Sequence, residues 1–98
     1  MQRAEVWWAN LPQPAGHRPV VVVTREQAIG VREFVVVAQV TSRIRHLPVE
    51  VPLGPEEGLP KACAANCDVL ITIPKTQLDK RITTAAIVSH EPDLLRIL

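Results

Sequence analysis

The amino-acid sequence predicts a mainly β protein with short helices, and residues 1–98 are expected to form one domain. Three observations point to this class. The apolar residues are mostly Val, Ile and Leu, which favour strands, and the aromatic residues are limited to Trp7, Trp8 and Phe34. Nine prolines in 98 residues imply frequent turns. Short strands at this spacing predict a small, strongly curved β-barrel followed by one C-terminal helix.

The expected strands differ in how deeply they lie in the core. The apolar runs at residues 19–24 and 34–40 are continuous, so both should be buried on two faces. Residues 49–53 alternate between apolar and polar side chains, which predicts one face in water. The full set of expected strands is residues 3–11, 19–24, 34–40, 49–53, 61–66 and 69–73, with a break at Cys67 and Asp68 and a stop at Pro74.

Turns and short helices are expected between these strands. Residues 12–16 predict a tight loop that is stiffened by prolines and turns at Gly16. Residues 25–30 predict a loop or one helical turn, and residues 76–80 predict another helical turn. A final helix is expected after Ser89, which suits an N-cap, with an apolar stripe formed by Leu94, Leu95, Ile97 and Leu98.

Charge and cysteine content restrict the kind of partner. The formal net charge is +1, lower than is usual for proteins that bind nucleic acid over a whole basic surface. Contact with nucleic acid therefore needs a local cluster, and Arg43, Arg45 and His46 form one. Cys63 and Cys67 are a single pair and the three histidines are far apart, so we expect structural cysteines, no metal and no cofactor. No apolar stretch is long enough to span a bilayer, so a cytoplasmic protein with reduced cysteines is expected.

Two loops carry the candidate functional residues. Arg18 enters a strand of valines, where its charge is costly unless it meets water, a carboxylate or a phosphate. Thr41, Ser42 and Arg43 follow another buried strand and add two hydroxyls and a second guanidinium. Together these residues predict an anion-binding site on the rim of the fold. The alternative for Arg18 is a structural ion pair, and the alternative for the two hydroxyls is turn formation.

A series of short motifs resembles the MazF/PemK-type toxins of bacterial toxin–antitoxin pairs. In order they are Glu5-Val6-Trp7, Gly16-His17-Arg18-Pro19, Val40-Thr41-Ser42-Arg43, Leu47-Pro48, Gly58-Leu59-Pro60-Lys61 and Cys67-Asp68. The resemblance implies an SH3-like barrel of the CcdB/MazF type that forms a homodimer. It also implies a toxin that acts as a metal-independent, sequence-specific endoribonuclease on single-stranded RNA, and a cognate antitoxin that blocks its groove. In the family the RNA 2′-hydroxyl is the nucleophile, and the cut leaves 2′,3′-cyclic phosphate and 5′-hydroxyl ends.

The chain departs from the family pattern at three places. The loop before Arg18 lacks several residues that normally cover the active site and help to select bases. The C-terminal helix is shorter by a turn or two. Val69 stands where the family often has Gln, which removes an amide that reads a base. These departures bear on base recognition and on packing at the C-terminus.

The implied reaction needs charge stabilisation and proton transfer. Arg18 suits the first task because a guanidinium binds two phosphate oxygens and stays charged. Thr41 and Ser42 are expected to hydrogen-bond the phosphate or the 2′-oxygen. His17 and Asp68 are the candidates for proton transfer. His17 qualifies only if the loop bends, because neighbours in an extended segment point to opposite faces.

RNA binding is expected from further side chains around these loops. Arg43, Arg45 and Lys61 are candidates for phosphate contacts, and Asp68 matches an acidic family position near the groove. Trp7 or Trp8 is expected to stack a base, and Trp8 is the candidate. Alternation requires one of the two rings to be core, and the alternatives for the outward ring are a dimer contact and an antitoxin contact.

Two other functions are compatible with the same fold. One is a toxin that binds DNA gyrase without nuclease chemistry, and the other is a degenerate barrel that only binds RNA or a peptide. An antitoxin is expected to lay an acidic or apolar segment over Arg18 and Arg43. No membrane partner is expected.

Overall fold

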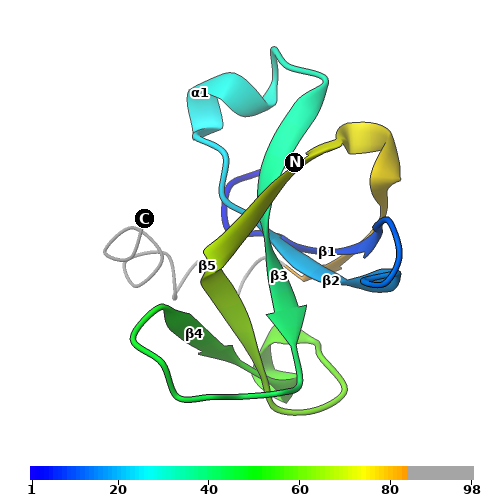
Figure 1. Ribbon diagram of the computed structural model, residues 1–98. Coiled ribbons are helices and arrows are strands. Elements are labelled where there is room, and N and C mark those ends of the chain that lie inside the picture. The colour runs from blue at the N-terminus through cyan, green and yellow to red at the C-terminus, as the bar shows by residue number, and fades with distance from the viewer. Residues whose placement is uncertain (84–98) are drawn as a thin grey trace.

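The computed structural model of the protein describes residues 1–83, and the expected final helix lies outside these residues. The described part is mainly β, as predicted (Figure 1). Its elements in chain order are β1 (Val6–Asn10), β2 (His17–Val22), α1 (Glu26–Ile29), β3 (Phe34–Thr41), β4 (Glu50–Leu53), η1 (Pro55–Glu57), β5 (Cys63–Pro74), η2 (Lys75–Gln77) and β6 (Leu78–Thr83).

All six strands form one antiparallel sheet in the order β4-β5-β3-β2-β1-β6. The long strand β5 crosses the molecule beside β3, while α1 and β4 lie at opposite ends (Figure 1). The predicted closed barrel is not what residues 1–83 form. In that part of the chain the sheet is bent but open, with β4 and β6 as its edge strands.

The valine run of β2 is buried on both faces, as its continuous apolar sequence predicts. Val20 and Val22 belong to one core cluster, whereas Val21 and Val23 belong to another. The neighbouring strand β3 divides in the same way, with Val37 in the first cluster and Val40 in the second. The sheet therefore carries a core on each side.

Two expected strand boundaries are corrected by the pairing. The expected strand at residues 19–24 runs instead from 17 to 22, because His17 already pairs with Asn10 directly after the tight loop. The two expected strands at 61–66 and 69–73 are one strand, β5. The expected break is a bulge in that strand: Asn66 pairs with Gln39 and Leu70 with Ala38, so residues 67–69 have no partner on β3.

The segment after Pro74 also differs from expectation. Residues 76–80 were expected to form one helical turn, but only η2 is helical there and Leu78 already begins β6. The strand was missed because residues 79–81 are Asp, Lys and Arg, which give no apolar alternation. Charged side chains of this kind are typical of an edge strand, where they discourage further pairing.

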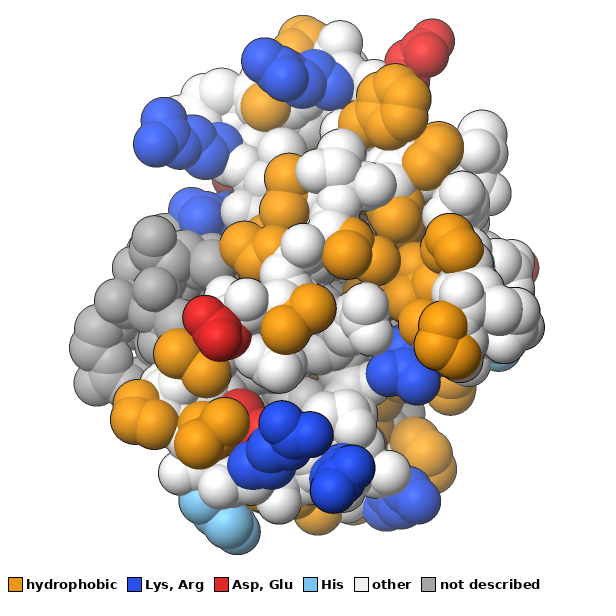
Figure 2. All heavy atoms as spheres, viewed as in Figure 1, with side chains coloured by type: hydrophobic (Ala, Val, Ile, Leu, Met, Phe, Trp, Pro, Cys, Tyr) orange, Lys and Arg blue, Asp and Glu red, His pale blue; other side chains and the backbone are white. Residues whose placement is uncertain are grey.

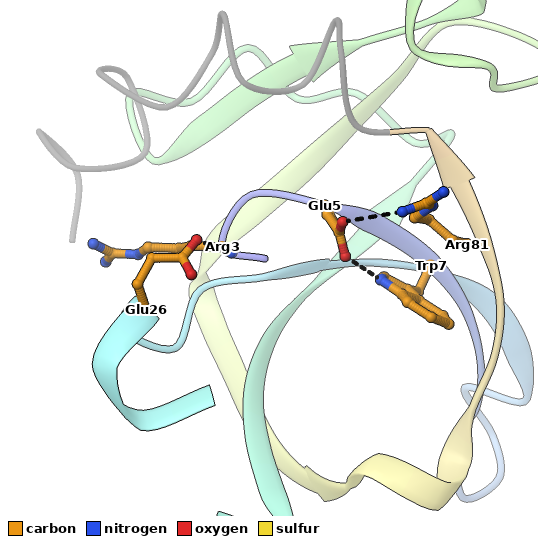
Figure 3. A network of polar contacts seen from close by, with 5 residues as sticks. All are labelled: Arg3, Glu5, Trp7, Glu26 and Arg81. Atoms are coloured by element: carbon orange, nitrogen blue, oxygen red, sulfur yellow. Dashed lines mark hydrogen bonds and ion pairs between the residues drawn. The ribbon is translucent and has the colours of Figure 1, made fainter. Parts of the chain in front are cut away.

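A buried carboxylate joins β6 to the N-terminal strand. Glu5 is only 2% exposed, and its Oε1 accepts a hydrogen bond of 3.0 Å from Trp7 Nε1. Its other oxygen lies 3.6 Å from Arg81 Nη1 on β6 (Figure 3). In the same view Arg3 lies beside Glu26, which accepts a hydrogen bond from the Arg3 backbone N–H. These contacts tie the first residues of the chain to α1 and to the edge strand β6.

Candidate active site

The tight loop at residues 11–16 holds Arg18 in place. Gly16 has a φ of 65°, in the left-handed region that favours glycine, and its carbonyl accepts a hydrogen bond from the Leu11 N–H. The turn brings the Ala15 carbonyl 3.0 Å from Arg18 Nε, which donates to it. Arg18 Nη1 donates a longer hydrogen bond of 3.4 Å to Gln39 Oε1. The loop and β3 therefore fix the guanidinium from two sides.

Arg18 is half-buried and forms no ion pair with any carboxylate side chain that the structure describes. A guanidinium has five N–H donors, and the two contacts with Ala15 and Gln39 use only two of them. The alternative of a structural ion pair is therefore not seen in the described part of the chain. What remains is a fixed cation with free donors, which suits an anion with two oxygens in a plane.

A groove of about 240 Å³ opens beside this guanidinium and is called the Arg18 groove below. It collects side chains from β1, β2, the end of β3 and the segment before β5. Its lining residues are Trp8, Arg18, Pro19, Val40, Thr41, Ser42, Leu59, Pro60, Lys61 and Cys63. Five of the residues predicted from the sequence to be functional thus share one groove: Trp8, Arg18, Thr41, Ser42 and Lys61.

The two hydroxyls lie where β3 ends and the chain turns away. Thr41 Oγ1 accepts a hydrogen bond of 3.1 Å from the Arg43 N–H, so this residue does form the turn. The hydroxyl hydrogen of Thr41 is still available as a donor, and the residue lines the groove. The next residue, Ser42, is exposed. Turn formation and groove lining are therefore combined in Thr41.

The Cys63 thiol, which lines the Arg18 groove, is unreactive. Cys63 is buried, and burial raises the pKa of its thiol against a smaller lowering by the Lys61 charge. The thiol donates to the Lys61 carbonyl at 3.2 Å. Burial also raises the pKa of the Cys67 thiol. Both cysteines are free and remain protonated near neutral pH, so neither is a ready nucleophile.

His17 lies beside the groove but does not line it. Because it is already in β2, it follows the alternation of an extended strand and its neighbour Arg18 takes the other direction. Its ring stacks on Trp8 with centroids 5.0 Å apart and an angle of 13° between the planes. Its Nε2 lies 3.4 Å from Asp79 Oδ2. The bend that would bring both side chains to one face is not present.

Three other predicted residues lie outside the lining of the Arg18 groove. Arg43 and Arg45 are exposed beyond the end of β3, and the Arg45 N–H donates to Glu50 Oε1 at 3.0 Å. Asp68 is exposed on the bulge of β5, where its N–H donates to Asn66 Oδ1 at 3.0 Å. All three side chains therefore lie apart from the space beside the Arg18 guanidinium.

Sequence analysis missed Gln39, the side-chain partner of Arg18. A signal was present, because Gln39 is the one amide within the apolar strand and is two residues before Thr41. Residues two apart in a strand share a face. The pattern thus placed an amide next to the predicted site.

A larger hollow of about 660 Å³ lies at the other end of β3. Arg3, Arg25 and Arg32 border it, and exposed Phe34 and Leu70 contribute to its apolar wall. Figure 2 shows basic side chains next to apolar ones on this side of the molecule. The smaller Arg18 groove is the better candidate for chemistry, because there a fixed guanidinium and two hydroxyls line one space.

The described residues contain no cluster of three His, Cys, Asp or Glu side chains that could hold a metal ion. None of the helices within residues 1–83 has the length and apolar character needed to cross a membrane.

A family profile described as "PemK-like, MazF-like toxin of type II toxin-antitoxin system" matches residues 2–91. The chain belongs to this family. Among curated relatives, the "Probable endoribonuclease MazF2" of Mycobacterium tuberculosis is 38% identical over 84 residues, which are 85% of this chain and 80% of the relative. The "Probable endoribonuclease MazF5" of the same species is 37% identical over 82% of this chain and 73% of its own length.

Solved structures agree with this family assignment. The "Mycobacterium tuberculosis toxin MazF-mt6" superposes with a TM-score of 0.84 at 32% identity, covering 95% of this chain and 90% of that structure. An "Endoribonuclease in complex with its cognate antitoxin from Mycobacterial species" superposes with a TM-score of 0.77 over 99% of this chain and 93% of that structure. At 23% identity, the second likeness concerns the fold alone. The resemblance found in the sequence motifs is confirmed.

Proposed function

We propose that the protein is the toxin of a type II toxin–antitoxin pair and cuts single-stranded RNA at a short sequence without a metal ion. The observation that carries this proposal is the fixed, unpaired guanidinium of Arg18 in one groove with Thr41 and Ser42. Family membership and relatives named as endoribonucleases support it. The toxin domain is taken to include residues 1–98.

The chemistry is an in-line transfer within the RNA itself. The 2′-oxygen forms a bond to phosphorus and loses its proton, while the bond from phosphorus to the 5′-oxygen breaks and that oxygen gains a proton. The products are a 2′,3′-cyclic phosphate and a 5′-hydroxyl. Arg18 stabilises the charge that develops on the phosphoryl oxygens, because its position is fixed before the substrate arrives. Thr41 and Ser42 hydrogen-bond the phosphate or the 2′-oxygen and hold the line of attack.

Neither candidate for proton transfer lines the Arg18 groove, and His17 is kept as the hypothesis although it points away from Arg18 in β2. Of the two candidates, His17 is the one that touches a groove residue, through its stack on Trp8. The carboxylate of Asp79, 3.4 Å from Nε2, orients the ring. Asp68 lies on the exposed bulge of β5 and is retained as a contact for RNA.

Binding of a longer RNA uses the surface around the groove. Trp8 stacks a base, and Lys61, which lines the same groove, contacts a phosphate. Arg43 and Arg45 extend the basic surface beyond the end of β3. The protein is proposed to act as a homodimer in the cytoplasm, where RNA is present. A cognate antitoxin is proposed to cover Arg18 and Arg43.

The test is cleavage of a long single-stranded RNA by the purified protein in the presence of EDTA. Mass spectrometry identifies the fragment ends, and Arg18→Ala is compared with Arg32→Ala, which removes an exposed arginine away from the groove. We expect cyclic phosphate and 5′-hydroxyl ends from the parent and from Arg32→Ala, and loss of cleavage in Arg18→Ala. Intact RNA from folded parent protein that is free of antitoxin would instead favour a gyrase-directed toxin or a degenerate binder.

A further inference from the structure

A second cavity lies next to the Arg18 groove and is lined by the residues that hydrogen-bond Arg18. It has a volume of about 420 Å³ and is called the Gln77 cavity below. Ala15 and Gln39, the two residues that hydrogen-bond the Arg18 guanidinium, both line it. Its lining residues are Leu11, Pro12, Pro14, Ala15, Gln39, Ile71, Thr72, Ile73, Pro74 and Gln77. A ligand in this cavity is therefore one side chain away from the phosphate site.

The walls of the cavity suit a flat, weakly polar ring. Three prolines and the aliphatic side chains of Leu11, Ile71 and Ile73 provide apolar surface, while no charged side chain lines it. Two glutamine amides are the strongest polar groups of the lining. Pockets that bind small ligands combine apolar walls with a few polar groups that fix orientation.

The amide of Gln39 has a defined orientation. Arginine is only a donor, so the contact with Arg18 Nη1 uses the Oε1 atom of Gln39. The Nε2 group of the same amide remains as a donor, and Gln39 lines the cavity. The contact between Arg18 and Gln39 thus orients two groups, the Arg18 guanidinium and the Nε2 donor of Gln39.

Gln77 supplies the complementary acceptor. Its Oε1 is shielded from solvent and has no hydrogen-bond partner among residues 1–83. An unpaired buried carbonyl is costly, so the amide gains by rotating toward a donor that enters the cavity. A nucleobase offers such a donor together with an acceptor for Gln39, whereas an aliphatic peptide side chain offers neither.

We propose that the Gln77 cavity is a nucleobase subsite, which binds the base of a nucleotide adjacent to the phosphate held by Arg18. The inference rests on the proposed ribonuclease function and extends it to the choice of cut sequence. Gln39 and Gln77 read the edge of the base, and the prolines contact its faces. The protein then selects one base position through Gln77, which does not line the Arg18 groove, and through Gln39, which also orients Arg18.

The experiment profiles cleavage of a randomised RNA pool by sequencing of the fragment ends. Gln77→Leu removes the amide at nearly constant size, and Gln27→Leu makes the same change on the exposed surface of α1. We expect Gln77→Leu to lose roughly 3- to 10-fold of the base preference at one position next to the cut, as for one neutral hydrogen bond. Gln27→Leu should keep the profile of the parent. If Gln77→Leu cuts RNA with an unchanged profile at every position, the subsite is refuted while the ribonuclease function stands.

A binding measurement separates the two proposals if the parent does not cut. Fluorescently labelled oligonucleotides with 2′-O-methyl sugars cannot undergo the reaction, and each base is placed in turn within one fixed sequence. A preference for one base that disappears in Gln77→Leu but not in Gln27→Leu supports the subsite without any cleavage. Equal dissociation constants for all bases in the parent, or an equal preference in both variants, overturn it.

Discussion

Arg18 and Gln39 hold each other across the neighbouring strands β2 and β3. The Nη1 group of the arginine donates to the Oε1 atom of the amide at 3.4 Å, while the loop carbonyl of Ala15 accepts from Nε at 3.0 Å. Neither contact neutralises the guanidinium. Its direction is therefore set by neutral acceptors, and its full charge stays available to a phosphate.

Replacing Gln39 should affect the rate more than substrate binding. Gln39→Leu removes one of the two contacts that orient Arg18 and is expected to lower kcat about 10-fold with a smaller change in KM. Gln39→Glu should be more harmful, because a carboxylate would pair with the guanidinium. Steady-state cleavage of a fluorogenic RNA gives both constants. A rise in KM alone would show that Gln39 binds RNA without positioning Arg18.

His17 should be required for the rate and not for the fold. His17→Asn keeps a flat polar side chain but cannot transfer a proton, so single-turnover cleavage should fall by about 100-fold. Asp79→Asn should cost less, because it only weakens the orientation of the ring. Unchanged circular dichroism makes the rates comparable. Full activity of His17→Asn would remove this residue from the mechanism.

The contribution of Lys61 should be visible in the salt dependence of binding. One phosphate contact to single-stranded RNA changes the slope of log K against log salt by about 0.7. Lys61→Ala is expected to reduce the slope by that amount, and Arg32→Ala, at the hollow beside the other end of β3, should leave it unchanged. Fluorescence anisotropy with a 2′-O-methyl oligonucleotide measures both. Parallel slopes for Lys61→Ala and the parent would exclude the contact.

The two tryptophans should differ in their effect on stability. Trp7→Phe leaves the buried Glu5 Oε1 without its indole donor and is expected to lower the free energy of unfolding by about 1–3 kcal/mol. Trp8→Phe keeps a ring on His17 and should cost less. Urea unfolding followed by circular dichroism compares them. Equal losses would mean that the donor of Trp7 contributes little.

Stability should fall at alkaline pH because of the cysteines. Burial raises the pKa of both thiols in the folded state, so the unfolded chain loses these protons first. Stability is then full below the ordinary thiol pKa of about 8.5 and is lost as pH rises from there through the raised folded values. The variant carrying Cys63→Ala and Cys67→Ala should show a flatter profile in urea unfolding. An equally steep decline would assign the effect to other groups.

The parts of the structure that were predicted are those with a local signal. The valines of β2 and β3 predict two buried strands by composition alone. Arg18 and Thr41 were predicted as site residues because each lies near the end of one of these strands. The bulge of β5 was predicted as a break, because Cys67 and Asp68 interrupt the pattern but pairing with β3 resumes at Leu70. Strand β6 was missed because a contact that holds it in place comes from a distant part of the chain. Its Arg81 pairs with the buried Glu5, which lies just before β1. Gln77 could not be predicted as a site residue for the same reason. The cavity that it lines forms only where the loop at residues 11–16 lies next to β5.

The tight loop at residues 11–16 has two roles. Its prolines form one wall of the Gln77 cavity, and its Ala15 carbonyl holds Arg18. Any insertion that reshapes the wall also displaces the carbonyl. A change in this loop that alters the preferred cut sequence therefore also alters the turnover rate. To change the cut sequence alone, a second substitution in β3 has to restore the position of Arg18.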